Sequence, residues 1–593
     1  MKKRSDIDEK FKWDLSSLYK NLDEFNKDYD YLVNNYLKYK DYEGKLNSAK
    51  VILNFLKFDE EFSKKFEAVY SYSSLKFDED VTNFKYQEIS GKLDKLSTEV
   101  AEVTSYIVPE LMKLSMDDID RFIKEEKEFK LYKFEFEKLL RGKKHVLSSN
   151  EEKLLASFSS PLSSFEEISS FLCNSDMKFK DIVKDGENKE LTNTNFSVYI
   201  TDKDREVRKQ AFYNLYKEYE NMQNTFATVY SNHVKYANAN AKVRGYKDAR
   251  AAALFGSNVD DKIYDNLIST LHKNLNIMDD YYKLKKEVLG LDELHIYDIY
   301  ADLISESSKE YTFNEAKEIV LNALSVLGED YINDLKKAFD EKWIDIYPNE
   351  GKRGGAYSSG CYTSNPYVLL NFNGKLNDVS TLAHELGHSM HTYYSNKNNP
   401  YVYHGYKIFV AEVASQVNEI LLARYMIDHT SDKLEKLNIL DNLMELFKGS
   451  IVRQTMFAEF EYEMHKCESN GEILTSKFIS DKYYELYKKY SGNEMICDPE
   501  IRYEWEKIPH FYYNFYVYQY ATGLAAACYI ANGILEGKKG FKESYLKFLT
   551  LGGSMYPVLE LKEALVDISD PKVIQEGMDM FKSVIKEFKE LYK

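Results

Sequence analysis

The chain has 593 residues, 44% of them hydrophobic and 15% aromatic, which is enough for a large core in one or several domains. Its 80 basic and 97 acidic residues give a formal net charge of −17, which argues against a nucleic-acid partner. No run approaches the ~18 apolar residues of a membrane span, and no apolar segment follows the basic N-terminus, so we expect neither a membrane partner nor a secretory signal.

The chain up to Phe339 is typical of amphipathic helices joined by short polar turns. The full 593-residue sequence contains only 25 Gly and 9 Pro, which favours long helices. The predicted helices are Asp23–Tyr42, Ala49–Phe58, Glu60–Lys76, Asn83–Val108, Arg205–Arg244, Ala249–Phe255, Asp260–Glu287 and Asn314–Phe339. Lys178–Thr194 is more strand-like, with Asp185-Gly186 as a hairpin turn, and we place a soft domain boundary there.

Cysteine usage predicts the compartment. The five cysteines are widely scattered and form no C-x-x-C pair. This pattern indicates reduced thiols rather than a disulfide framework, and we expect a cytoplasmic protein.

The residue pattern changes between Trp343 and Lys375, where we expect strands and a loop instead of helices. Ile344–Tyr347 and Tyr367–Phe372 read as strands, and the glycine-rich piece between them reads as a loop. A strand that leads straight into a helix is a place where an extended peptide can pair, so Tyr367 and Leu369 are candidate substrate contacts. The alternative is an ordinary structural strand.

The stretch Asp378–Tyr394 has the strongest chemical signal in the chain. His384, Glu385 and His388 spell H-E-x-x-H on a predicted helix with Asp378 as its N-cap. Residues four apart share a helix face, so both imidazoles can reach one zinc ion and Glu385 can reach a water beside it. Two solvated surface histidines are the alternative. Gly387 inside the helix predicts close packing against another element.

A catalytic zinc needs a third protein ligand. Glu412 and Glu419 lie on one polar face of the next predicted helix, and composition alone does not separate them. His391 has helical spacing for a ligand, but a packed or supporting role is favoured.

Zinc hydrolysis also needs hydrogen-bond donors for a developing oxyanion. His510 and three tyrosines in an uncharged aromatic stretch, Tyr513, Tyr516 and Tyr520, are candidates. The tyrosines share one face if the segment is helical, and an aromatic packing stripe is the alternative.

Several motifs together resemble the thimet oligopeptidase and oligoendopeptidase F family of zinc metallopeptidases, and the oligoendopeptidase F branch is closer. They are HELGHSMH, FVAEVASQ, GKRGGAYSSG, PYVLLNFNG and PHFYYNFYVYQYATG. The resemblance covers nearly the whole chain. Two features depart from the thimet branch: Val413-Ala414 stands where many of its members have a proline, and the His-to-Tyr spacing differs by one.

The resemblance implies a mainly α, zincin-like (neurolysin-like) body with a deep substrate channel and a small sheet beside the metal helix. It implies an N-terminal helical region over 1–110, an oligopeptidase F-type helical region over 111–195 and a zinc metallopeptidase catalytic region over 196–593.

The same resemblance implies site roles. His384, His388 and Glu412 would bind one zinc ion per chain, Glu385 would be the general base, and Glu419 would support the ligands. His510 and one tyrosine would contact the substrate carbonyl; Tyr516 is favoured, but the different spacing leaves Tyr513 and Tyr520 open for that role. We also expect Tyr513, Tyr520 and His391 to lie along the substrate. The expected activity is hydrolysis of internal bonds in short unstructured oligopeptides. The alternatives are a zinc exopeptidase and a non-catalytic helical binding protein with a structural metal site; the oligomeric state stays open.

Overall fold

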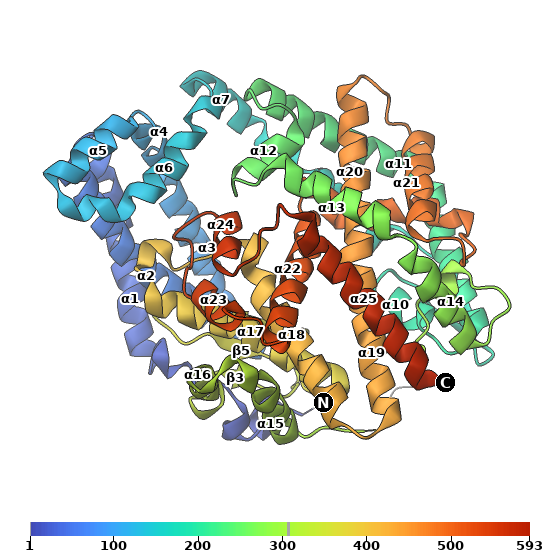
Figure 1. Ribbon diagram of the computed structural model, residues 1–593. Coiled ribbons are helices and arrows are strands. Elements are labelled where there is room, and N and C mark those ends of the chain that lie inside the picture. The colour runs from blue at the N-terminus through green and yellow to red at the C-terminus, as the bar shows by residue number, and fades with distance from the viewer. Residues whose placement is uncertain (1, 305–308) are drawn as a thin grey trace. The chain divides into compact units, whose positions relative to one another are not determined.

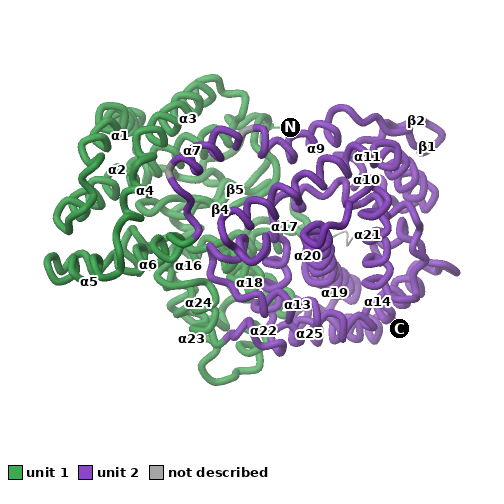
Figure 2. Tube along the Cα trace, turned by 90° about the horizontal axis from the view of Figure 1, so that it is seen from above, with its two compact units in different colours: residues 1–144, 309–425, 530–565 green, residues 145–308, 426–529, 566–593 purple. Residues whose placement is uncertain are grey.

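The computed structural model describes residues 2–304 and 309–593, and the described chain is mainly α-helical (Figure 1). It divides into two compact units, each built from separate stretches of sequence (Figure 2). Unit 1 comprises residues 1–144, 309–425 and 530–565, and unit 2 comprises residues 145–308, 426–529 and 566–593. Within the described ranges, no helix has both the length and the apolar character needed to cross a membrane.

Unit 1 begins with helices that pack around an aromatic core. Trp13, Tyr39 and Phe62 are among its buried rings. The helices of this unit are α1 (Leu22–Asn35), α2 (Ala49–Glu79), α3 (Phe84–Thr104), α4 (Ile107–Leu111), α5 (Met116–Glu125), α6 (Lys133–Arg141), α15 (Phe313–Ala323), α16 (Glu329–Asp340), α17 (Leu376–Asn398), α23 (Phe541–Phe548) and α24 (Pro557–Glu563). Most of α18 (Ile408–His429) also belongs here, as does the end of α22 (Tyr518–Leu535).

A three-stranded sheet lies beside α17 in unit 1, in the order β3-β5-β4. The strands are β3 (Ile344–Asp345), β4 (Tyr357–Ser359) and β5 (Tyr367–Leu369). β3 runs parallel to β5 and β4 runs antiparallel to it. The apolar run of β5 suits the central position, because such a strand is covered on both faces and paired along both edges.

Unit 2 is helical apart from a short hairpin, β1 (Ile182–Lys184) and β2 (Glu187–Lys189). Its α-helices are α7 (Ser149–Ser157), α8 (Ser159–Ser163), α9 (Phe165–Phe171), α10 (Phe196–Ile200), α11 (Arg205–Val243), α12 (Ala249–Phe255), α13 (Asp261–Asn274), α14 (Ile277–Leu289), α19 (Lys433–Phe447), α20 (Gln454–Ser469), α21 (Ser476–Tyr490) and α25 (Pro571–Tyr592). A π-helical turn, η11 (Lys448–Arg453), joins α19 to α20, and the 3-10 helices η12 (Pro499–Lys507) and η13 (Pro509–Tyr512) precede α22.

The helix predictions differ from the structure mainly in where one helix ends and the next begins. The two helices predicted over Ala49–Phe58 and Glu60–Lys76 form one, α2, because neither glycine nor proline interrupts them. The helix predicted over Asn314–Phe339 is broken at Gly328, whose φ of 104° lies outside the helical region. The hairpin at Asp185-Gly186 is confirmed, with φ of 53° and 77° at the two turn residues.

The glycine-rich segment predicted as a loop contains a strand. Tyr357–Ser359 forms β4 at the edge of the sheet, paired with Tyr367–Leu369. Three residues between glycine-rich flanks carry almost no sequence periodicity, so pairing with β5 rather than local pattern creates this strand.

Candidate metal centre

The helix α17 carries two histidines on one face. Their Nε2 atoms, in His384 and His388, lie 3.2 Å apart, as the four-residue spacing predicts. The helix begins one turn before the predicted N-cap: Lys375 occupies that position, and Asp378 accepts the backbone N–H of Lys375 and of Asn373. Asp378 thus still satisfies free N–H groups at the helix start, from inside the first turn.

Close packing against α18 explains the glycine in α17. A Cβ atom on Gly387 would lie 2.5 Å from Cα of Ser415, nearer than two carbons can approach. The Asn418 side chain also donates to the Ala383 carbonyl at 3.0 Å. The small residues at this crossing let the α18 backbone reach α17, which brings the carboxylates of α18 to the histidines.

The structure separates the two carboxylates that composition left undecided. Glu412 Oε2 is 3.6 Å from Nε2 of both His384 and His388, and Ser415 Oγ donates to it at 3.2 Å. Glu419 Oε1 instead lies 3.2 Å from Nδ1 of His384, on the opposite edge of that ring. A carboxylate at Nδ1 holds the imidazole with Nε2 free to bind a metal.

The donor set of His384, His388 and Glu412 fits a zinc ion. One ligand atom from each lies within 4.8 Å of the others. Two imidazole nitrogens and one carboxylate oxygen are the ligands of a catalytic zinc that keeps a position open. The side chains are 24%, 19% and 29% exposed, so the centre is also accessible from outside.

Glu385 lies beside this donor set with a perturbed pKa. Burial raises the pKa of its carboxyl to about 7, opposed by His384 and reinforced by Glu412, while the Ser358 backbone N–H donates to the carboxylate. A carboxyl with a pKa near neutrality can both take and return a proton. Ser358 belongs to β4, so the edge of the sheet adjoins the Glu385 carboxyl; no sequence signal singled out Ser358.

The pKa values of the two histidines are shifted in opposite directions. Burial, together with the charge of His384, lowers the pKa of His388 to about 4. Burial also disfavours the charged form of His384, but its hydrogen bond to Glu419 and the nearby carboxylates outweigh this and raise its pKa to about 8. A metal ion requires the unprotonated nitrogen of each ring, so metal binding would release the proton from His384.

The prediction that a substrate strand pairs with Tyr367–Phe372 is wrong for this sheet. β3 and β4 occupy both edges of β5, and Tyr367 and Leu369 are fully buried. The Tyr367 hydroxyl donates to the Asp14 carbonyl at 2.8 Å, which is a structural contact. Strand order is set by pairing of distant segments, which hydrophobic pattern does not reveal.

His391 packs in the core rather than along a substrate. It is 1% exposed, and its ring stacks on Tyr406 at a centroid distance of 3.8 Å and an angle of 7°. Burial lowers its pKa to about 3, so it stays neutral. The alternative of a packed role, favoured from the sequence, is the correct one.

His510 and the three tyrosines belong to unit 2, where they form one cluster. Rings of Tyr513 and Tyr516 lie 6.2 Å apart, and those of Tyr516 and Tyr520 lie 5.5 Å apart. The segment is not one continuous helix: η13 ends at Tyr512 and α22 begins at Tyr518. Between them the chain turns through Asn514 and Phe515, which have φ of 45° and 57°.

The hydroxyls of this cluster differ in their partners. Tyr513 donates to Glu166 Oε1 at 2.7 Å, and Tyr520 lies 3.5 Å from His510 Nε2. Within the described part of the chain, the Tyr516 hydroxyl makes no hydrogen bond. Burial lowers the pKa of His510. In the unit 2 cluster, the Tyr516 hydroxyl therefore has no hydrogen-bond partner among the described residues and lies near the neutral imidazole of His510.

Comparison with known proteins identifies families whose sequences match this chain. Two family models match the chain, Peptidase family M3 over residues 198–580 and Oligopeptidase F over residues 110–179. Oligopeptidase PepF of Bacillus subtilis is 41% identical over 590 residues, covering 99% of this chain and 88% of that protein. Group B oligopeptidase PepB of Streptococcus agalactiae is 39% identical over 591 residues, covering 99% and 98%.

Solved structures agree with the sequence matches. A crystal structure from Chlamydophila abortus superposes with a TM-score of 0.94 at 35% identity, covering 100% of both chains. The structure of oligoendopeptidase-F from Enterococcus faecium gives a TM-score of 0.75 at 34% identity, covering 96% of this chain and 99% of that one.

Proposed function

This chain belongs to peptidase family M3 and is a metalloendopeptidase, and on that premise we propose that it is a zinc enzyme that cleaves internal bonds of short unstructured oligopeptides. The observation that carries the proposal is the convergence of His384, His388 and Glu412 beside Glu385. A structural metal site would close the fourth position with another protein ligand and would have no use for an adjacent base.

The three ligands hold one zinc ion per chain, and Glu419 orients His384 through its Nδ1. Zinc bound there supplies a Lewis acid that polarises the peptide carbonyl and lowers the pKa of water toward about 7. Glu385 takes a proton from the attacking water as its oxygen bonds to the carbonyl carbon. As the C–N bond breaks, Glu385 returns the proton to the leaving nitrogen.

The substrate is proposed to lie along β4 instead of β5. Tyr357–Ser359 is the unpaired edge of the described sheet on the side of Glu385, whose carboxylate accepts the Ser358 N–H. Backbone pairing at an edge requires an extended chain and selects no particular side chain, which suits unstructured peptides.

His510 and Tyr516 are proposed to donate hydrogen bonds to the substrate carbonyl oxygen as it gains charge. Their support is the family resemblance together with the uncommitted Tyr516 hydroxyl in the unit 2 cluster. Removing one donor of this kind typically lowers the rate ~10²–10³-fold.

The first test is cleavage of an internally quenched peptide with both ends blocked, by wild type and by Glu385→Gln. We expect cleavage by wild type, zinc in both proteins, and a rate at least ~10²-fold lower in the variant. Because the variant keeps all three ligands, equal zinc contents separate the loss of a base from the loss of the metal.

Two outcomes would contradict the proposal. Release of end residues from unblocked peptides, without cleavage of the blocked one, would indicate an exopeptidase. Zinc binding with no cleavage of either peptide would favour a non-catalytic helical binding protein.

A further inference from the structure

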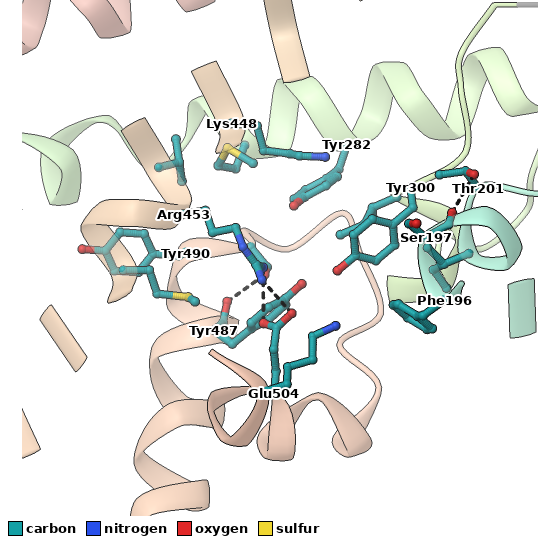
Figure 3. Close-up of a pocket in the computed structure, with 17 residues that line it drawn as sticks. Phe196, Ser197, Thr201, Tyr282, Tyr300, Lys448, Arg453, Tyr487, Tyr490 and Glu504 are labelled. Atoms are coloured by element: carbon teal, nitrogen blue, oxygen red, sulfur yellow. Dashed lines mark hydrogen bonds and ion pairs between the residues drawn. The ribbon is translucent and has the colours of Figure 1, made fainter. Parts of the chain in front are cut away.

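Unit 2 contains a cavity of about 340 Å³ that is remote in sequence from the H-E-x-x-H helix. It lies among α10, α14, η11, α20, α21 and η12, all of which belong to unit 2. Four tyrosines contribute to its wall, among them Tyr282, Tyr300 and Tyr487, and Figure 3 shows these side chains around the Arg453 guanidinium. The size and aromatic lining suit a single flat ring with a short polar arm.

The Glu504 carboxylate in the cavity wall already has hydrogen-bond partners. Glu504 is completely buried and accepts bonds from the Arg453 guanidinium at 2.8 and 3.3 Å. It also accepts the hydroxyl of Tyr483 at 2.5 Å. Arg453 has five N–H donors and a side chain that is 28% exposed, so it retains donors beyond those given to Glu504.

A second carboxylate behind the wall is shared by two lysines. Glu445 pairs with Lys448 at 2.5 Å and with Lys285 at 3.1 Å. Burial lowers the pKa of Lys448, although Glu445 opposes this. Glu445 therefore offers no surplus negative charge to the cavity.

Lys507 is the cation without a carboxylate partner. In the described part of the chain its ammonium group makes no salt bridge or hydrogen bond; it lies over the rings of Phe196 and Tyr216, 4.5 and 5.7 Å from their centroids. Burial lowers its pKa to about 8, and Glu504 only partly offsets this. An ammonium group left in this state is stabilised by any anion that reaches it.

The charged groups that line the cavity leave one positive charge in excess. The lining cations are Lys448, Arg453 and Lys507. Glu445 pairs with Lys448 and Glu504 pairs with Arg453, so Lys507 is the cation left over. One excess positive charge matches a monoanion better than a phosphate dianion.

We propose that this cavity binds a small aromatic carboxylate, with its carboxylate group between Lys507 and Arg453 and its ring among Tyr282, Tyr300 and Tyr487. The guanidinium and ammonium groups recognise the charge, and the tyrosine faces recognise the ring. This site is independent of the proposed peptidase function, since none of its residues belongs to the metal centre.

The test is calorimetric titration of the zinc-loaded full chain with 3-(4-hydroxyphenyl)propionate and with its primary amide. The two probes have the same ring and differ in charge. We expect the acid to bind at least ~10-fold more tightly than the amide, a difference of about 1.4 kcal/mol. Equal binding of both probes, or no binding of the acid at millimolar concentration, would overturn the proposal.

Variants assign the binding to this cavity. Lys507→Met should abolish the preference for the acid, and Lys507→Arg should keep it. Zinc-free protein should bind the acid as the zinc-loaded protein does; loss of binding on removal of zinc would place the anion at the metal centre and refute the proposal. If Lys507→Met does not fold, Ser197→Trp, at an exposed position of the cavity wall, carries the test, because it must weaken binding by obstruction.

Discussion

At the scale of single residues, Glu412 and Glu419 have identical side chains but contact different atoms of the two histidines. Seven residues, close to two helical turns, separate them, so both lie on the same face of α18. Glu412 meets the Nε2 atoms of both histidines, whereas Glu419 meets Nδ1 of His384. One is placed to bind a metal and the other to orient a ligand.

This difference in contacts predicts that the same Glu-to-Gln substitution lowers the zinc affinity by different amounts at the two positions. We expect Glu412→Gln to abolish stoichiometric zinc binding, because a neutral amide replaces the only carboxylate ligand. Glu419→Gln should retain zinc with an affinity ~10–100-fold lower, since only the orientation of His384 is lost. Competition with a chromogenic chelator measures both affinities. A larger loss in Glu419→Gln than in Glu412→Gln would reverse the assignment.

At the scale of elements, the crossing of α17 and α18 depends on the absence of a side chain at Gly387. Its missing Cβ leaves room for the backbone of Ala414 and Ser415. Backbone atoms cannot rotate away as the end of a side chain can, so relief of a clash there requires the helices to separate.

We therefore expect Gly387→Ala to destabilise the protein by about 1–3 kcal/mol and to lower its zinc content, because separation moves Glu412 away from the histidines. Gly91→Ala is the matched control: it lies exposed within α3 with no atom within 4 Å of the added Cβ. Alanine there should stabilise by about 0.5–1 kcal/mol. Thermal melting with metal analysis checks both, and an unchanged Gly387→Ala protein would contradict the packing argument.

The turn between η13 and α22 is a strained element with identifiable supports. Asn514 and Phe515 both have positive φ, which costs about 1–2 kcal/mol for each residue other than glycine. The Phe515 N–H donates to Glu461 Oε1 at 2.7 Å, and Asn514 Oδ1 lies 3.0 Å from His233 Nε2. These bonds hold the turn that carries Tyr513 and Tyr516.

Glu461 makes the stability of this element depend on pH. Burial raises its pKa from 4.5 to about 8, and the Phe515 N–H opposes the shift. Between these values the folded state binds a proton that the unfolded state does not, so stability falls as pH rises from about 4.5 to about 8 and levels off above that. From pH 6 to pH 8.5 we expect this group to cost about 2–3 kcal/mol.

Glu461→Gln isolates this contribution, because the amide keeps the acceptor oxygen and cannot ionise. Its melting temperature relative to wild type should rise by about 2 °C between pH 6 and pH 8.5. The relative measurement cancels the other titrating groups. A constant difference across this range would mean that Glu461 does not titrate there.

At the scale of the whole molecule, the residues assigned to chemistry come from both units. The metal ligands and Glu385 belong to unit 1, and His510 with its tyrosines belongs to unit 2. Each unit is assembled from separated stretches, so neither corresponds to a continuous segment of sequence. The regions predicted over 1–110, 111–195 and 196–593 stay a prediction about the sequence.

The proposed role of Tyr516 predicts that a unit 2 variant lowers turnover without lowering zinc content. Tyr516→Phe should lower kcat ~10²-fold or more with one zinc retained. Tyr513→Phe is the control, because its hydroxyl already bonds Glu166 and its loss should change kcat by less than ~3-fold. A larger effect at Tyr513 would transfer the oxyanion role to that residue.

The sequence alone determined what local geometry dictates. Four residues make about one helical turn, so His384 and His388 had to share a face, and the apolar run Tyr367–Leu369 had to be buried. The tertiary structure decided what depends on contacts between distant segments. Crossing of α17 and α18 separates Glu412 from Glu419, and strand pairing puts β4 at the edge of the sheet. Packing of unit 2 helices likewise leaves Lys507 without a carboxylate, because such pairing depends on side chains distant in sequence.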